Sequence, residues 1–182
     1  PRRLAADPLC GSAGAHVISD KFQAGMNRQI SNMREALARG MPRRGWKVGI
    51  NVPEVRQKLS LPHACVGWLD GDRIFSSGST IQFDEGATIH VEAEIAIEVS
   101  AEVDPTGDAV AARESIAAIY PALELVNYRK SAPNLDDVVA GSIFHDSTVL
   151  GTPSALPSSH SLGTETPVLS LEGKQFVPER SD

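Results

Sequence analysis

Apolar and polar residues alternate without interruption in segment 89–99, IHVEAEIAIEV. One set of alternate positions is entirely apolar, and the other carries His90, Glu92, Glu94 and Glu98. Because successive side chains of a strand point to opposite faces, the pattern predicts a β-strand with one apolar and one acidic face. That acidic face could contact water or hold a cation.

A helical period occupies segment 19–39. Ser19 or Asp20 can cap its start, and Gly40 followed by Pro42 ends it. Its apolar positions share one face of the predicted helix: Phe22, Met26, Ile30, Met33 and Leu37. We interpret this face as one that packs on the core.

The segment after this helix predicts a short strand and a short helix. Trp46, Val48 and Ile50 alternate with Lys47 and a glycine, so Lys47 projects from the face opposite to Trp46 and Val48. A proline at position 53 then opens the short helix. A lone lysine on a strand is usually solvated, and the pattern by itself assigns Lys47 no role.

The remaining segments predict a mixture of strands, turns and one further helix. Segment 66–81 is rich in Gly and Asp and is interpreted as a turn-rich connection, whereas 110–119 is predicted to be a helix closed by Pro121. Strands are predicted at 122–128 and 142–151. A hairpin over 168–177 is predicted to turn at Glu172 and Gly173.

Glu124 is the acidic residue that most needs an explanation, because it lies in an otherwise apolar predicted strand. A salt bridge to Arg129 or Lys130 would supply one. Glu92 and Glu94 would supply another: they are two residues apart on one strand face, about 7 Å at the backbone. If the two strands are neighbours, three carboxylates could surround magnesium, manganese or calcium.

Length and composition narrow the class of protein. The 182 residues suit one main domain, and a net charge of −6 without a basic stripe argues against a nucleic-acid partner. Cys10 and Cys65 are too few for a disulfide framework and have no zinc-ligand spacing. With no long apolar run and no apolar signal core, we expect a cytoplasmic protein that does not contact a membrane.

Four motifs, in order, resemble one enzyme family. They are GWKVGINVPEVRQKLSL from Gly45, VEAEIAIEV from Val91, YPALELVNYR from Tyr120 and TVLG from Thr148. Together they resemble the 2-keto-4-pentenoate hydratase and 4-oxalocrotonate decarboxylase branch of the fumarylacetoacetate hydrolase superfamily. The similarity spans roughly 45–151.

The resemblance implies an α+β fold: a mixed β-roll with peripheral helices, here lacking the usual C-terminal strands. It divides the chain into an N-terminal helical segment, 1–44, and a hydratase-like β-roll domain, 45–182. It also implies Mg²⁺ or Mn²⁺ held by Glu92, Glu94 and Glu124, with Lys47 as the catalytic residue for substrate orientation and proton transfer. The expected partners are a small 2-oxo acid and other copies of the chain in a homo-oligomer, or a related partner subunit.

The activity implied is that of a lyase, 2-oxopent-4-enoate hydratase-like, in which a metal stabilises the enolate of the 2-oxo acid. Decarboxylation and acylpyruvate-type carbon-carbon hydrolysis are alternatives on the same scaffold, and a non-catalytic partner subunit is a third. The motifs depart from the family at Asn127, where an aspartate is usual, and at Gly141 and Ser142, where an Asp-Asn pair is usual. The resemblance suggests Asp70, Asp72 and Ser142 as substrate-binding candidates.

Overall fold

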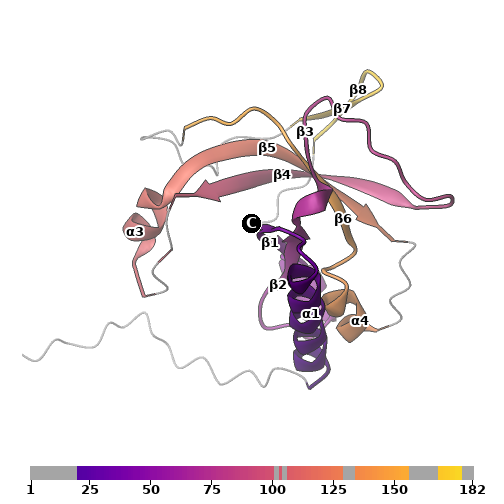
Figure 1. The fold of residues 1–182 in the computed structure, drawn as a ribbon, viewed down its shortest axis with the longest axis vertical. Coiled ribbons are helices and arrows are strands. Elements are labelled where there is room, and N and C mark those ends of the chain that lie inside the picture. The colour runs from indigo at the N-terminus through magenta and orange to yellow at the C-terminus, as the bar shows by residue number, and fades with distance from the viewer. Residues whose placement is uncertain (1–19, 101–102, 104–105, 129–133, 156–167, 178–182) are drawn as a thin grey trace, which may run out of the picture.

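The described part of the chain combines one long and three short α-helices with three small sheets. A computed structural model of the chain describes residues 20–100, 103, 106–128, 134–155 and 168–177. In chain order its elements are α1 (Asp20–Ala38), β1 (Arg43–Gly49), α2 (Pro53–Lys58), β2 (Cys65–Asp70), the 3-10 turn η1 (Gly71–Arg73), β3 (Ile74–Ser76), β4 (Ile89–Val99), α3 (Ala109–Glu114), β5 (Ile116–Asn127), α4 (Leu135–Ala140), β6 (His145–Leu150), β7 (Leu169–Leu171) and β8 (Lys174–Phe176) (Figure 1). The predicted α+β class is confirmed.

The largest sheet is mixed and has the strand order β3-β6-β5-β4. Strand β3 is parallel to β6, whereas β6, β5 and β4 are mutually antiparallel. Strands β4 and β5 pair along nearly their whole lengths and form the long curved ribbon in Figure 1. Strands β1 and β2 form a separate antiparallel pair, the β1–β2 hairpin, whose long connection contains α2. Strands β7 and β8 form a tight hairpin. These pairings bring strand segments far apart in sequence to one site.

The core lies where α1, α4 and the β1–β2 hairpin meet. A cluster of Leu61, Cys65, Val139 and Ile143 is buried there. Gln29 of α1 is fully buried and its side-chain amide donates to the backbone carbonyls of β2 and α4. The helices therefore anchor the hairpin that carries Lys47. Within the described part of the chain, no helix has the length and apolarity needed to cross a membrane.

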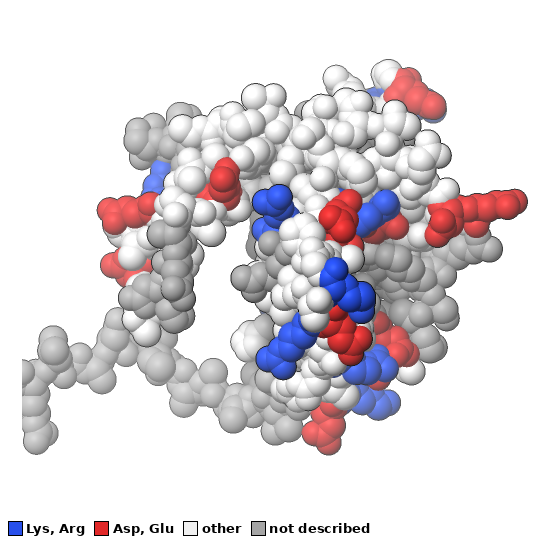
Figure 2. All heavy atoms as spheres, in the orientation of Figure 1, with Lys and Arg blue, Asp and Glu red and all other residues white. Residues whose placement is uncertain are grey.

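The alternating strands have their apolar faces largely exposed. Trp46 and Val48 of β1 are 43% and 57% exposed, whereas the side chain of Lys47 between them is only 8% exposed. On strand β4 the apolar residues Val91, Ile95, Ile97 and Val99 are likewise between 41% and 53% exposed. The opposite face of β4 is only partly covered, since Glu92 is half-buried whereas Glu94 and Glu98 are exposed. Much of the ribbon surface visible in Figure 2 is accordingly uncharged. Alternation thus predicted which residues share a face, but not which face is inside.

The turn of the β7–β8 hairpin is confirmed, and the first three elements lie where the sequence placed them. Glu172 and Gly173 have positive φ angles of 50° and 77°, as a tight two-residue hairpin turn requires. The prediction for 110–119 was wrong beyond Glu114, because Ile116 begins the ladder with β4 and the strand continues through Pro121. Segment 66–81 is more than a turn, since it contains β3 and most of β2, and α4 was not predicted.

Candidate metal centre

The register of β4 and β5 assembles the acidic cluster. Glu92 lies directly opposite Glu124, and Glu94 lies opposite Ala122, the next residue of β5 on the same face. One carboxylate oxygen from each of the three glutamates lies within 4.8 Å of the others. Carboxylate oxygens are the ligands that hard divalent cations such as Mg²⁺, Ca²⁺ and Mn²⁺ prefer. The three glutamates therefore fit the magnesium or manganese ion that the sequence suggested.

Lys47 reaches the cluster from the β1–β2 hairpin. Its ammonium group donates to Oε1 of Glu124, and the two side chains are only 8% and 5% exposed. Lys47 pairs in register with Gly67, where an added Cβ would lie 3.1 Å from Lys47 Cγ. The absence of a side chain at Gly67 gives the lysine stem room to lie flat. Arg129 and Lys130, the alternative partners of Glu124, lie outside the described residues.

His145 is a further member of the cluster that the sequence did not identify. Its Nδ1 lies 2.9 Å from the same Glu124 oxygen that Lys47 contacts, and its side chain is 4% exposed. An ionised carboxylate only accepts hydrogen bonds, so Nδ1 carries the proton in this contact. The register of β5 and β6 brings His145 to Glu124, and no local sequence pattern could have predicted that register.

The three carboxyl groups have different electrostatic surroundings. Burial alone would raise the pKa of Glu124, but the His145 hydrogen bond and the charge and hydrogen bond of Lys47 outweigh it and hold that pKa below its ordinary value. Partial burial, followed by the negative charge of Glu124, raises the pKa values of Glu92 and Glu94. Three carboxylates and one ammonium leave two negative charges uncompensated, which a divalent cation would neutralise.

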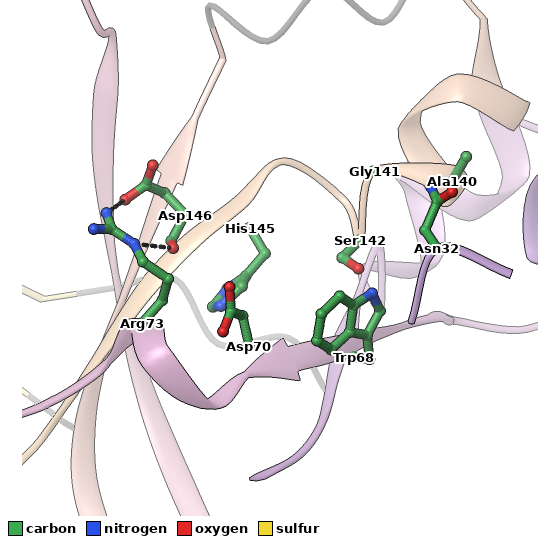
Figure 3. Close-up of a pocket in the computed structure, with 9 residues that line it drawn as sticks. All are labelled: Asn32, Trp68, Asp70, Arg73, Ala140, Gly141, Ser142, His145 and Asp146. Atoms are coloured by element: carbon green, nitrogen blue, oxygen red, sulfur yellow. Dashed lines mark hydrogen bonds and ion pairs between the residues drawn. The ribbon is translucent and has the colours of Figure 1, made fainter. Parts of the chain in front are cut away.

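A cavity of about 370 Å³ has His145 in its wall, whereas Lys47 and the three glutamates are not among the residues that line it. Two of the sequence candidates, Asp70 and Ser142, also line it, whereas Asp72 is exposed and its backbone N–H donates to Asp70 Oδ1 at 2.9 Å. Figure 3 shows Asp70 and His145 between an Arg73–Asp146 ion pair on one side and Trp68 and Ser142 on the other. The full lining is Asn32, Trp68, Asp70, Arg73, Ala140, Gly141, Ser142, His145 and Asp146.

Two polar residues of β4 outside the cluster have contacts of their own. Glu98 is exposed and accepts a hydrogen bond from the Tyr120 hydroxyl at 2.5 Å. At the other end of β4, the ring of Tyr128 packs edge-on against His90 with a centroid separation of 4.7 Å. Burial, with the charges of Glu92 and Glu124, raises the pKa of the Tyr128 phenol. Tyr128 therefore lies within the electrostatic field of the glutamates.

Asn127, which departs from the motif that the sequence resembles, contacts the backbone here. Its backbone N–H donates to the carbonyl of Phe144 at 2.9 Å, and its side-chain oxygen accepts from the backbone of Thr88 at 3.3 Å. The residue thus ties the end of β5 to the turn before β6 and to the start of β4. A neutral amide there adds no negative charge to the three carboxylates.

Two solved structures with a similar fold are metal complexes of one enzyme. The chain superposes on 4-oxalocrotonate decarboxylase from Pseudomonas putida G7 complexed with calcium and acetate, with a TM-score of 0.60 and 20% identity over 71% of this chain and 50% of that one. The same enzyme complexed with magnesium and adipate gives a TM-score of 0.58 and 19% identity over 71% and 51%. No family model matches the sequence. The chain spans about half the length of these neighbours and shares their fold over that part.

Proposed function

We propose that this chain carries the site of a divalent-metal-dependent lyase that acts on a small 2-oxo acid. The observation that carries the proposal is the clustering of Glu92, Glu94 and Glu124 within 4.8 Å, with Lys47 on Glu124. The fold neighbours, which were solved with calcium or magnesium and with a carboxylic acid, support the same class of site. Mg²⁺ or Mn²⁺ is the proposed cofactor.

Each group of the site has a proposed task. The three glutamates hold the cation, which when bound supplies Lewis acidity to the oxygens of a 2-oxo acid. Lys47 supplies a positive charge beside the cluster, suited to orienting an anionic substrate and to proton transfer. Asp70 and Ser142 line the cavity that His145 borders and are the proposed contacts of the rest of the substrate.

Two lyase reactions are supported by different observations. The sequence motifs resemble a hydratase, in which water adds to the distal double bond of a 2-hydroxydienoate after ketonisation. The fold neighbours are decarboxylases, in which the departing carboxylate leaves its electrons in the same enolate. Both reactions require an enolate next to a carboxylate, so the same cation and lysine serve either.

The cation site can be tested independently of the reaction. Glu92→Gln removes one negative ligand with little change in size, and we expect Mn²⁺ affinity, measured from the EPR signal of the unbound ion, to fall by tenfold or more. Glu98→Gln is the matched control, because Glu98 lies on the same strand face but bonds to Tyr120. Equal affinities in wild type and Glu92→Gln would remove the basis of the assignment.

Product analysis separates the reactions. The chain is incubated with Mg²⁺ and, separately, with 2-hydroxypenta-2,4-dienoate, 2-oxalocrotonate and an acylpyruvate, and products are followed by NMR. Water addition to the first identifies a hydratase, CO₂ release from the second a decarboxylase, and cleavage of the third a hydrolase. Intact Mn²⁺ binding without turnover of any of them would contradict the lyase proposal and favour a non-catalytic partner subunit.

A further inference from the structure

His145 lies at the boundary between the acidic cluster and the cavity. Its Nδ1 lies 2.9 Å from Glu124 Oε1, and its ring forms part of the cavity wall with Trp68 and Asp70 (Figure 3). Its side chain is 4% exposed and that of Glu124 is 5% exposed, so the contact is shielded from bulk water. A buried contact of this kind constrains the orientation of both side chains.

An irregularity in the sheet brings His145 to this position. Leu125 pairs with Ser147, but the next residue of β5, Val126, pairs with His145 and skips Asp146. Because of this bulge, His145 shares the face of Glu124. A regular ladder would have placed Asp146 on that face and added a fourth carboxylate to the cluster.

The displaced residue has a partner of its own. Asp146 forms an ion pair with Arg73, whose Nε also donates to the Asp146 carbonyl at 3.1 Å. The bulge thus places the N–H donor of His145, instead of the Asp146 carboxylate, next to Glu124. The Asp146 carboxylate instead pairs with Arg73 of η1. Each carboxylate then faces a group that stabilises its ionised form.

The backbone before β6 is strained where it leads into this arrangement. Ser142, Ile143 and Phe144 have φ angles of 53°, 56° and 59°, a left-handed conformation that costs non-glycine residues roughly 1–2 kcal/mol each. The turn fits closely against β2, since a Cβ on Gly67 would lie 3.0 Å from the Ser142 carbonyl oxygen. Packing and the Asn127–Phe144 backbone hydrogen bond hold the turn in place.

We propose that His145 is a positioning residue for the cation site, holding the Glu124 carboxylate in the orientation in which it faces Glu92 and Glu94. Lys47 and His145 both bond to Oε1 of Glu124, and together they fix this carboxylate from two sides. The inference rests on the cation site of the proposed function, and it is independent of which reaction follows. Nothing in it requires His145 to touch the substrate.

The test compares the Mn²⁺ affinity of variants of the 182-residue chain at position 145. His145→Leu keeps the approximate size but removes the donor, and we expect the dissociation constant to rise about 10- to 100-fold, as with other residues that orient metal ligands. His145→Asn places an amide N–H near the position of Nδ1 and is expected to restore most of the affinity. His63→Leu, at an exposed histidine, is the control.

The possible results have distinct meanings. Unchanged affinity in a folded His145→Leu variant, judged by its circular dichroism, would overturn the inference while leaving the cation site intact. If that variant does not fold, His145→Asn is compared with His145→Gln, whose amide lies near Nε2 instead. Tighter binding by Asn supports the inference, and equal binding overturns it. Absence of Mn²⁺ binding by wild type would overturn the cation site and this inference together.

Discussion

Replacement of Lys47 by methionine tests the buried ion pair at the centre of the site. The substitution keeps most of the aliphatic stem beside Gly67 but removes the charge that faces Glu124. Removing one partner of a buried pair costs about 3–5 kcal/mol, because the other charge stays in a poorly solvated place. Since His145 still donates to Glu124, we expect the lower end, about 3 kcal/mol near neutral pH.

The loss should depend on pH in a defined direction. In wild type the pKa of Glu124 lies below its ordinary value of 4.5, so its stabilising contribution is present above 4.5 and is lost as the pH falls through the lowered pKa. Without Lys47, we expect burial to raise the pKa of Glu124. Acidification would then protonate Glu124 in the variant and remove the cost of its unpaired buried charge. The difference in free energy of unfolding between wild type and variant should therefore shrink as the pH approaches 4.5.

Urea unfolding in the presence of a metal chelator measures these quantities. Trp46 and Trp68 are register partners in the β1–β2 hairpin and report its unfolding by fluorescence. Adding Glu124→Gln to Lys47→Met removes both charges, and we expect the double variant to recover part of the loss. Lys58→Met, at an exposed residue of α2, should change stability by no more than about 0.5 kcal/mol. A loss below about 1 kcal/mol for Lys47→Met, or one independent of pH, would refute this account of the pair.

Three further predictions concern the core and the carboxylates. Gly25→Ala should destabilise the chain by about 1–3 kcal/mol in urea unfolding, because the Cβ of the new alanine would lie 2.7 Å from the Asp136 carbonyl oxygen. This clash outweighs the better helix propensity of alanine. A gain in stability would show that α4 moves freely. Gln29→Leu should cost about 2–4 kcal/mol in the same assay, because one buried and one partly buried carbonyl lose their donor. A neutral result would show that water replaces the donor. Because the pKa values of Glu92 and Glu94 are raised, the metal-free chain should lose stability as the pH rises from 4.5 through these raised values. Mg²⁺ should raise the melting temperature more at about pH 7.5 than at about pH 5, since it binds the ionised carboxylates. An equal rise at both pH values would argue against binding by these carboxylates.

Sequence periodicity predicted the components of the site because parity is a local property of a strand. Glu92 and Glu94 had to share a face, and Lys47 had to project away from Trp46. Which face is enclosed depends on segments far along the chain. Lys47 is buried because Glu124 lies 77 residues away in sequence but adjacent in space, so the expectation that a strand lysine is solvated did not hold there.

The sequence did not predict the start of β5, helix α4 or the position of His145. Either these features depend on pairing with distant strands, or the segment is too short to show a period. Segment 116–119 has alanines and isoleucines at helical spacing, but pairing with β4 extends it as a strand. Helix α4 has only six residues, too few to show a helical period. His145 reaches Glu124 only because β6 skips one residue in its ladder, and no pattern within β6 announces that bulge.

A divalent cation at the three glutamates would also stabilise the sheet. Among the described strands, β4 hydrogen-bonds to β5 alone, and its apolar side chains are largely exposed, so packing holds it weakly. Glu124 on β5 is already compensated by Lys47 and His145, whereas Glu92 and Glu94 on β4 face negative charge. A bound cation would therefore chiefly strengthen the attraction between β4 and β5. The same residues that would bind the ion for chemistry would then join the edge strand to the fold.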